Sequence, residues 1–419
     1  MKSKKLLGVV LSIIMVGTLF AGCTNKSGDS SNGEKVNIKY ATYSAGPDHI
    51  QDLEKMIAEF EKQNPDINVE YEVMGFDNYF TKLQTQASSN TLPDIFEINY
   101  ENFITYAENG VLLELDDLQK KDSTFKPEDL SGEAFKYFNY KDKLFGLTEK
   151  FSDVVLYYNK DLFDEAGVSY PTEDWTWDEE LEASKKLTKD NTFGSYSPIQ
   201  FTELYKTVAQ NGGSLFDKDG NPTINSKENI EAVQWMMDKM HKYNIQPTPK
   251  QMSGKTPEEM FKNGELAMIR TGSWMFGTFN DASFDWDIAL EPGNTNKVHH
   301  VFADGIVASK NTKNPESTWK FIKFMSLDPE ATKIRLESNW DLPAASNEDI
   351  KKTFLENKKP ASREVIFKAL DTGIMPPVVK KNSQVQDIVN KELNQAVIEA
   401  KTVEQALNDA QNQVEKIIK

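Results

Sequence analysis

Two loops in the first quarter of the chain combine aromatic rings with carboxylates and amides. Their candidate ligand-binding residues are Tyr43, Ser44, Asp48 and His49, and then Glu97, Asn99, Tyr100, Glu101 and Asn102. Flat rings stack on apolar faces of a ligand, while carboxylates and amides hydrogen-bond in fixed directions. This combination favours non-covalent capture of a polar ligand. The alternative is that Tyr43 and Tyr100 pack in a core and that Glu101 or Asn102 caps a helix.

Motifs for covalent or metal-assisted catalysis are absent from the sequence. It contains no G-x-S-x-G nucleophile turn, no phosphate-binding P-loop and no H-E-x-x-H zinc motif. A pair of carboxylates, as in a glycoside hydrolase, is the enzymatic alternative that stays open, because 65 acidic residues bring some pair together by chance. We therefore expect a binding protein with no catalytic residues.

Metal and cofactor sites are not expected either. The stretch from Asp217 to Asn221 superficially resembles a calcium loop, but its glycine stands at the fourth position instead of the sixth. His299 and His300 are adjacent in what we interpret as a polar loop, where such a pair is usually solvated. A single cysteine excludes a disulfide scaffold and a cysteine-based zinc site. We predict no metal and no cofactor.

The charge balance narrows the classes of ligand and partner. The chain has 419 residues, with 48 Lys and Arg against 65 Asp and Glu, and a formal net charge of -17. Nucleic acid is not an expected partner, because binding its phosphates requires a basic surface. The only arginines are Arg270, Arg335 and Arg363, and phosphate or carboxylate ligands are usually clamped by guanidinium groups. A neutral ligand is therefore favoured.

The N-terminal segment is interpreted as a targeting signal. Three lysines among the first five residues precede an uncharged apolar run, Leu6 to Phe20, whose 15 residues are too few for a membrane span of about 20. Phe20-Ala21-Gly22-Cys23 resembles a bacterial lipobox, in which the cysteine is lipidated, although Phe20 stands where Leu is usual. The resemblance implies a signal peptide over 1–22 and lipidation of Cys23. An ordinary signal peptide is the alternative.

A polar segment and then alternating strands and helices follow the signal. Residues 23–35 are rich in Ser, Gly and Asn and predict a flexible tether. Hydrophobic periodicity predicts strands over 36–40, 67–73, 93–98, 154–158, 267–269 and 306–308, helices over 50–60, 79–87, 178–187, 228–240, 257–263 and 316–326, and a mainly helical stretch from 350 to the end. Strands separated by helices favour an α/β fold with a mostly parallel sheet, whose ligand loops follow the carboxyl ends of the strands.

Five short motifs, in register along the chain, resemble those of the extracellular solute-binding proteins of carbohydrate ABC importers. They are Pro93-Asp94-Ile95-Phe96, Tyr158-Asn159-Lys160-Asp161-Leu162-Phe163, Phe261-Lys262-Asn263-Gly264-Glu265-Leu266-Ala267-Met268, Gly272-Ser273-Trp274 and Asp304-Gly305-Ile306. The resemblance implies a two-lobed, periplasmic-binding-protein-like α/β fold, with a mostly parallel sheet in each lobe and a hinge that the chain crosses more than once. It also implies a first lobe from 36–148 and 300–345 and a second lobe from 149–299 and 346–419.

The resemblance carries ligand contacts onto further positions of this sequence. They are Ser152, Asp153, Gln200, Thr202, Tyr205, Trp274, Asp304, Gly305, Trp340 and Asp341. Trp274 is the strongest candidate for a ring that stacks beneath a sugar, because it follows a glycine directly after a short strand. Packing in the core or hinge is the alternative. Glu101 and Asn102 depart from some oligosaccharide binders, which place an arginine beside an aspartate there.

The function that the resemblance implies is capture of a neutral mono- or oligosaccharide by hinge closure between the lobes. Delivery to ABC permease subunits with their ATPase would follow. The expected protein is a monomer held by its lipid at the extracellular face of the cell membrane. A surface adhesin that holds polysaccharide without transport is an alternative with the same site and the same anchor.

Overall fold

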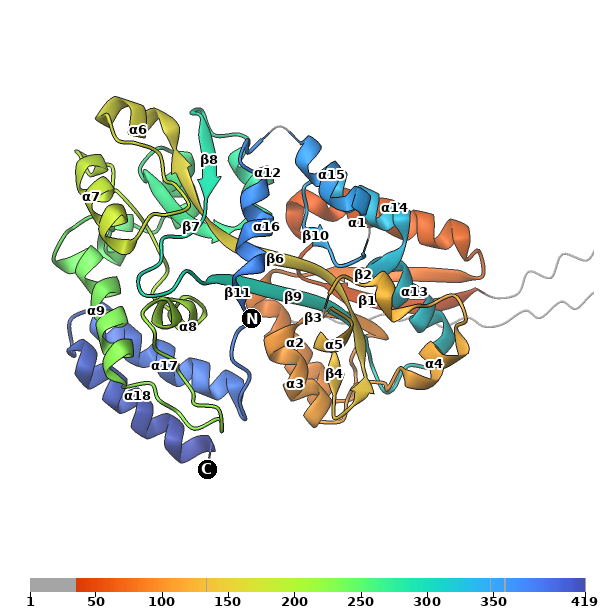
Figure 1. The fold of residues 1–419 in the computed structure, drawn as a ribbon. Coiled ribbons are helices and arrows are strands. Elements are labelled where there is room, and N and C mark those ends of the chain that lie inside the picture. The colour runs from red at the N-terminus through yellow and green to blue at the C-terminus, as the bar shows by residue number, and fades with distance from the viewer. Residues whose placement is uncertain (1–34, 133, 347, 358, 419) are drawn as a thin grey trace, which may run out of the picture. The chain divides into compact units, whose positions relative to one another are not determined.

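Three parallel strands begin the described part of the chain (Figure 1). The structure is a computed structural model that describes residues 35–132, 134–346, 348–357 and 359–418. Strand β1 (Val36–Thr42) pairs in parallel with β2 (Ile67–Val73) and with β3 (Ile95–Asn99). Helices α1 (Gly46–Gln63) and α2 (Phe76–Ser88) make the two crossovers. The βαβ pattern predicted for this region is confirmed.

Two long strands extend the sheet away from these three. Strand β6 (Gly146–Asn159) pairs antiparallel with β9 (His299–Ala308). Strand β9 also pairs antiparallel with β3, and the second half of β6 pairs antiparallel with β7 (Met268–Gly272) and β8 (Trp286–Ala289). The strand order along the main path is β10-β6-β9-β3-β1-β2.

The pairing of β6, β7, β8 and β9 differs from the mostly parallel sheet that the sequence suggested. Every ladder among these four strands is antiparallel, so the sheet as a whole is mixed. The physical reason is the path of the chain: β6 leaves the region of β1 to β3 and β9 returns to it, so neighbouring strands run in opposite directions.

The remaining elements surround this sheet or connect its strands. The short strands are β4 (Asn139–Tyr140), β5 (Lys143–Leu144), β10 (Leu342–Pro343) and β11 (Gly373–Ile374). The other helices are α3 (Tyr100–Glu108), α4 (Asp116–Lys121), η1 (Pro127–Asp129), α5 (Ala134–Tyr137), α6 (Lys160–Ala166), α7 (Trp177–Leu187), α8 (Phe201–Gln210), α9 (Lys227–His241), α10 (Pro249–Met252), α11 (Pro257–Lys262), η2 (Ser273–Met275), α12 (Phe276–Phe279), α13 (Pro315–Leu327), α14 (Pro329–Glu337), α15 (Glu348–Glu356), α16 (Glu364–Asp371), α17 (Asn382–Val397) and α18 (Val403–Ile418). The helices predicted from hydrophobic spacing are confirmed, with ends that move by a few residues.

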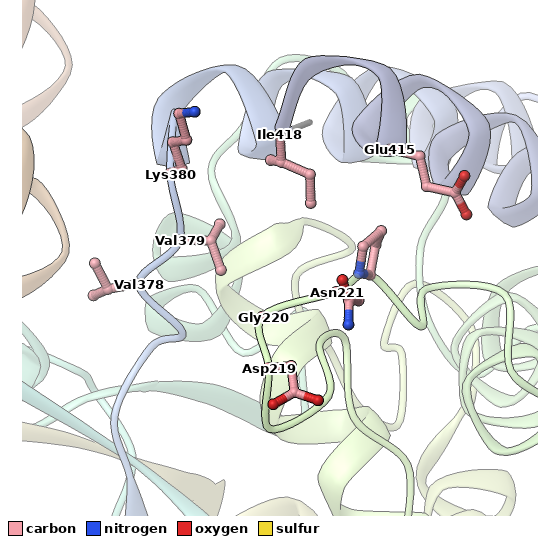
Figure 2. Close-up of a pocket in the computed structure, with 9 residues that line it drawn as sticks. Asp219, Gly220, Asn221, Val378, Val379, Lys380, Glu415 and Ile418 are labelled. Carbon is pink, nitrogen blue, oxygen red and sulfur yellow. The ribbon is translucent and has the colours of Figure 1, made fainter.

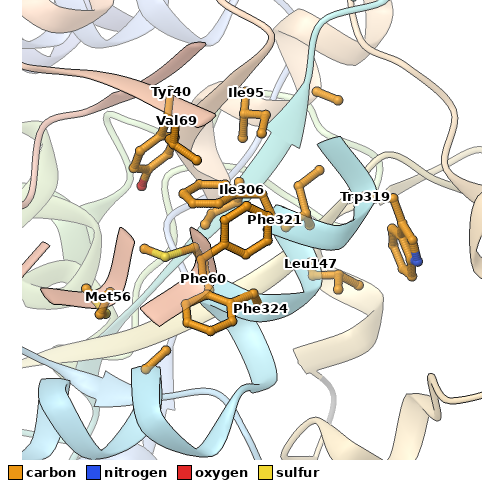
Figure 3. Packing of buried hydrophobic residues seen from close by; sticks show 14 of the residues in the cluster. Tyr40, Met56, Phe60, Val69, Ile95, Leu147, Ile306, Trp319, Phe321 and Phe324 are labelled. Atoms are coloured by element: carbon orange, nitrogen blue, oxygen red, sulfur yellow. The ribbon is translucent and has the colours of Figure 1, made fainter. Parts of the chain in front are cut away.

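Buried hydrophobic side chains form several separate cores. One core packs α1 and α13 on β1 to β3, with Phe60, Phe321 and Phe324 in edge contacts (Figure 3). Another packs α8, α9, α17 and α18 on one another. Separate cores are consistent with two lobes. The exact lobe boundaries stay a prediction. Leu336 and Leu342, assigned to the first lobe, pack in a core with residues of the second.

No helix in the described part of the chain is both long enough and apolar enough to cross a membrane. The predicted signal peptide, the tether up to Glu34 and the lipidation candidate Cys23 lie outside the described residues.

Candidate functional site

One face of the β6–β9 pair gathers polar and aromatic side chains from distant parts of the sequence. Lys150 is opposite Asp304 in the ladder, and Ser152 is opposite Phe302. Opposed residues of an antiparallel ladder lie on the same side of the sheet, as do residues two apart on one strand. His300, whose ring stacks on Phe302 at 5.5 Å between centroids, lies on this side too. We name this surface, made of Lys150, Ser152, His300, Phe302 and Asp304, the β6–β9 face.

Trp274 lies beside this face, and 41% of its surface is exposed. It is in η2, directly after β7, and its ring centroid is 6.2 Å from that of Phe302. Its ring folds back over Gly272, where an added Cβ would stand 1.9 Å from a ring carbon. Only glycine permits this approach. The ring therefore contacts Phe302 and leaves much of its surface to solvent, as a stacking platform requires.

Glu97 fixes the loop that follows β1. Its carboxylate accepts hydrogen bonds from the backbone N–H of Tyr43 (3.1 Å), the backbone N–H of Ser44 (3.2 Å) and Ser44 Oγ (3.0 Å). Thr42 Oγ1 and Lys150 Nζ donate to it as well. The side chain is fully buried, so these contacts make Glu97 an organiser of the loop.

Tyr43 connects this loop to the β6–β9 face. Its hydroxyl donates a hydrogen bond to Asp304 Oδ1, and its ring lies edge-on to Tyr79 at 5.1 Å and to Phe76 at 5.3 Å. Burial, and then the Asp304 carboxylate, raise the pKa of Tyr43 well above its usual value. The hydroxyl therefore stays protonated and donates.

Lys150 lies at the centre of a group of buried charges that sequence analysis missed. Its ammonium contacts Glu97, and it lies 3.7 Å from Asp341, 3.9 Å from Asp304 and 3.9 Å from Glu149. Arg335 pairs with Glu149 from the other side. We name this set, Lys150, Arg335, Glu97, Glu149, Asp304 and Asp341, the Lys150 cluster. Its described members are four carboxylates and two cations.

The pKa values of the carboxylates in the Lys150 cluster shift in opposite directions. Although burial opposes it, Lys150 lowers the pKa of Glu97. Burial raises the pKa of Asp304 to about 6 and that of Asp341 to about 7, against a partly compensating attraction to Lys150. Burial alone would lower the pKa of Lys150, but Glu97 and Asp341 raise it above its ordinary value. Lys150 is therefore charged, and the cluster retains protons on its carboxylates near neutral pH.

The loop after β3 lies at the start of α3. Asn102 Nδ2 donates to Asn99 Oδ1 at 2.7 Å, and the ring of Tyr100 lies 5.8 Å from that of Tyr137. Glu101 Oε2 is buried and has no hydrogen-bond partner among the described residues. Burial raises the pKa of Glu101 to about 7. Asn382 Nδ2 donates to the carbonyl of Glu101 at 3.4 Å, so α17 touches α3 here.

The candidates from the predicted second lobe differ in exposure. Gln200 is exposed at the start of α8, whereas Tyr205 is buried with its ring 5.2 Å from that of His300. His300 Nε2 lies 2.7 Å from the carbonyl of Thr202. Within the described structure, neither the Tyr205 hydroxyl nor either oxygen of Asp153 has a hydrogen-bond partner.

Three further candidates are held in close packing. Trp340 is buried, stacked on His49 at 4.9 Å, and the Arg335 guanidinium lies 4.5 Å from its ring centroid. An added Cβ on Gly305 would stand 2.4 Å from the ring of Phe138. Asp48 is in the first turn of α1, and its side chain lies outside the description. The ligand role of all these positions stays a prediction.

The prediction that His299 and His300 lie in a solvated loop is wrong. Both are buried in β9, because this strand begins seven residues earlier than the predicted one. His300, Glu203 and Glu291 approach closely enough to resemble a metal site. Lys206 Nζ, however, lies 2.7 Å from a carboxylate oxygen of Glu203 and of Glu291. A divalent ion there would be repelled by this ammonium, so the residues do not fit a metal.

These carboxylates belong to a second buried charge group. Arg270 contacts Glu180 through two hydrogen bonds of 2.8 and 2.6 Å, and its Nε lies 3.4 Å from Glu291. Lys239 lies 3.9 Å from Glu180. We name the set of Arg270, Lys206, Lys239, Glu180, Glu203 and Glu291 the Arg270 cluster. It supports α8 and the position of His300 beneath Tyr205.

A hollow of about 610 Å³ lies away from the β6–β9 face, between the turn at 219–222, the segment 378–380 and α18 (Figure 2). None of the nine described residues that line it is aromatic. The turn itself is closed by Asp217 Oδ1, which accepts from the backbone N–H of Asp219 and of Asn221, as expected for a plain turn instead of a calcium loop. The aromatic rings are instead at the β6–β9 face.

Known proteins resemble this chain over nearly its whole length. The family model of bacterial extracellular solute-binding proteins matches residues 46–332. An ABC substrate-binding protein from Listeria monocytogenes, solved in complex with cycloalternan, is 44% identical; the match covers 91% of this chain and 99% of that one, with a TM-score of 0.89. The maltodextrin-binding protein of Bacillus subtilis is 26% identical, covering 97% of this chain and 96% of its own. A maltooligosaccharide ABC transporter solute-binding lipoprotein of Streptococcus pneumoniae is 23% identical, and the match covers 100% of this chain and 98% of that protein.

The predicted two-lobed α/β fold is confirmed by this structural match. The family model spans the loop after β3, Trp274 and both long strands. With 44% identity over 91% of its length to a solved member of this class, the chain belongs to the family of bacterial extracellular solute-binding proteins.

Proposed function

We propose that this protein is the substrate-binding lipoprotein of an ABC sugar importer and captures a neutral oligosaccharide. The observation that carries the proposal is the β6–β9 face, where the exposed ring of Trp274 contacts the half-buried ring of Phe302 and the half-buried Tyr43 bonds Asp304. A sugar offers apolar ring faces surrounded by hydroxyls, and this face offers aromatic surface beside hydrogen-bonding groups.

Arginine pairing supports a neutral ligand. Arg270 is held by Glu180, Arg335 by Glu149, and Arg363 by the carbonyls of Phe354 and Lys359. All three guanidinium groups are buried in these contacts. None of the chain's arginines is therefore placed to clamp a phosphate or carboxylate at the β6–β9 face.

The relatives support an oligosaccharide in particular. The Listeria protein was solved with cycloalternan, and the two other relatives are named for maltodextrin and maltooligosaccharide. We infer that this protein binds cycloalternan or a related glucose oligosaccharide. The relatives are binding proteins, and the protein is proposed to bind its sugar without cleaving it.

Unsatisfied polar atoms suggest how closure selects the ligand. Glu101 Oε2 and the Tyr205 hydroxyl are buried without a hydrogen-bond partner in the described structure. Asp153 also has none there, but it faces the side of β6 opposite to Ser152, away from the β6–β9 face. Leaving such groups unsatisfied costs about 1–3 kcal/mol each, which hydroxyls of a bound sugar would offset. The ligand would thereby bind the closed arrangement of the two predicted lobes more tightly than the open one, and shift their populations.

Lipidation of Cys23 would hold the protein at the outer face of the cell membrane, where permease subunits can accept its sugar. A diacylglyceryl group anchors stably because it buries two chains. Metabolic labelling with a fatty acid should mark the wild type and spare Cys23→Ser. Labelling of both would contradict the anchor.

Calorimetric titration of the full-length protein in detergent tests the ligand class. Cycloalternan or maltodextrins should bind, glucose 6-phosphate should not, and Trp274→Ala should weaken binding by about tenfold or more. Trp175→Ala, which removes a partly exposed ring distant in sequence from the proposed site, is the matched control and should bind normally. Equal affinity in the wild type and Trp274→Ala would contradict the placement of the platform.

Two further assays separate sugar transport from the alternative functions, adhesion and hydrolysis. Deletion of the gene should abolish uptake of the bound sugar, whereas an adhesin would leave uptake intact. Chromatography of each oligosaccharide after incubation with the protein should recover it unchanged. Release of shorter sugars would establish a hydrolase instead.

A further inference from the structure

Two exposed aromatic rings of the described chain are connected to the β6–β9 face. Among all the described residues, the exposed large hydrophobic side chains are Tyr71, Phe76, Trp274, Leu355 and Ile398. Trp274 was expected from the sequence. Phe76, the first residue of α2, was not, although 52% of its surface is exposed.

Phe76 is held in place by neighbouring rings and not by burial. It lies edge-on to Tyr43 and to Phe80, each at 5.3 Å between centroids. Tyr43 and Phe80 are themselves only partly buried. The ring is therefore fixed on one side and open to solvent on the other, and it has no polar atom that would prefer water.

Three contacts and one step along β9 connect Phe76 to Trp274. Phe76 touches Tyr43, and the Tyr43 hydroxyl bonds Asp304. Asp304 is two residues from Phe302 on the same side of β9, about 7 Å along the strand. Phe302 then meets Trp274. The two exposed rings thus end one strip of aromatic and carboxylate groups.

Three residues, Tyr43, Asp304 and Phe302, lie between Phe76 and Trp274 in the series. The ring centroids of Phe76 and Tyr43 are 5.3 Å apart and those of Phe302 and Trp274 are 6.2 Å apart, so each of these steps is as long as one stacking contact. A ligand that stacks on both exposed rings therefore needs more than one sugar unit.

We propose that Phe76 is a second sugar platform, and that it makes the site prefer oligosaccharides long enough to reach from Trp274 to Phe76. The proposal rests on the proposed function, because it assumes that the same face binds a sugar. Its occupant is a second sugar unit of the same oligosaccharide, away from the unit that stacks on Trp274. Mono- and disaccharides would engage Trp274 alone.

Calorimetry on the full-length protein with glucose, maltose, maltotriose, maltotetraose and cycloalternan tests this length selection. The wild type should bind maltotetraose at least tenfold more tightly than maltose. Phe76→Ala should lower the affinity for maltotetraose and cycloalternan by about tenfold and leave maltose within twofold. Trp274→Ala should lower the affinity for every sugar that binds.

Tyr71→Ala is the matched control. Tyr71 is also an exposed aromatic residue, in β2, but its hydroxyl donates a hydrogen bond to Glu54, and it is not part of the strip. It should leave all affinities unchanged. Equal losses for maltose and maltotetraose in Phe76→Ala, no loss for either, or a wild type that does not discriminate by length would overturn the proposal. If no sugar of the series binds the wild type, the proposed function fails first, and the role of Phe76 fails with it.

Discussion

The molecule contains two buried charge groups that differ in balance. In the Arg270 cluster, three cations face three carboxylates, so the formal charges balance. In the Lys150 cluster, two cations face four carboxylates among the described residues. The Lys150 cluster shares Lys150 and Asp304 with the β6–β9 face, and the Arg270 cluster meets this face at His300, next to Glu203 and Glu291.

The difference shows in the direction of the pKa shifts. Although burial opposes it, Arg270 lowers the pKa of Glu180 to about 2, and Lys206 likewise lowers that of Glu291. In the Lys150 cluster, burial keeps the pKa of Asp304 and Asp341 raised. The titrating groups therefore differ in kind: in the Arg270 cluster burial lowers the pKa of a cation, Lys239, to about 8, whereas in the Lys150 cluster the groups that change protonation near neutral pH are carboxylates. Of the two, the Lys150 cluster contacts the strip of rings proposed to bind sugar.

Lys150→Met should produce the largest loss of stability. It leaves four carboxylates with Arg335 as their remaining cation, and uncompensated buried charge costs about 5 kcal/mol, or roughly 5–10 °C of melting temperature. The carboxylate pKa values then rise further, so the loss should shrink as pH falls from 8 to 5. Thermal unfolding at both pH values checks this. A loss that does not depend on pH would contradict the excess of carboxylates.

Arg270→Met should cost less, about 3 kcal/mol at pH 8, because three carboxylates still face two cations. The double variant Arg270→Met with Glu180→Gln should recover part of the loss, since it removes the paired charge as well. Unfolding curves of both variants at pH 8 and pH 5 give the comparison. Should Arg270→Met vary more with pH than Lys150→Met, the contrast between the two clusters would be wrong.

Glu101→Gln should stabilise the protein at high pH. The raised pKa of Glu101 means that its contribution to the free energy of unfolding is present below about pH 4 and is lost as pH rises through about 7. As pH rises from 5 to 8, the free energy of unfolding of the glutamine variant should therefore increase relative to that of the wild type by on the order of 1 kcal/mol, or about 1–2 °C of melting temperature. Exposed Glu108→Gln, on the same helix, is the control. A constant offset at both pH values would refute a buried titrating carboxyl.

Tyr43→Phe should have the smallest effect. It removes the hydrogen bond to Asp304 but keeps the ring beside Phe76, so the free energy of unfolding should fall by about 1 kcal/mol. Tyr71→Phe removes an exposed bond to Glu54 and should change the melting temperature less. Equal changes in the two variants would show that Tyr43 is not coupled to the Lys150 cluster.

Much of the local structure could be predicted because it depends on neighbouring residues. Alternating apolar positions predict β1 and β2, and helical spacing predicts α1 and α7. The exposure of Trp274 was also predictable, since core periodicity does not explain a large ring directly after Gly272-Ser273 at the end of a strand.

Other features depend on contacts between distant segments and could not be predicted. A lysine in a strand is ordinarily interpreted as solvated, and the partners that bury Lys150 come from positions 97, 304 and 341. Strand β9 was expected to be short because Asp304 and Gly305 are typical of a turn, whereas pairing with β3 and β6 extends it through both residues. Phe302 and Phe76 carry no local signal that separates a platform ring from a core ring.

The β6–β9 ladder has one irregularity, between Thr148 and Lys150, where an extra residue bulges. Beyond it, each residue of β6 faces the side opposite to its neighbour, so deleting one residue would exchange the sides of Ser152 and Asp153 and of every position up to Asn159. The strand can therefore change length only in steps of two, or by placing an odd residue in a bulge. Uncompensated single-residue insertions and deletions are consequently disfavoured in this ribbon, so exchange of side chains along an unchanged backbone is the simpler route to new ligand preferences.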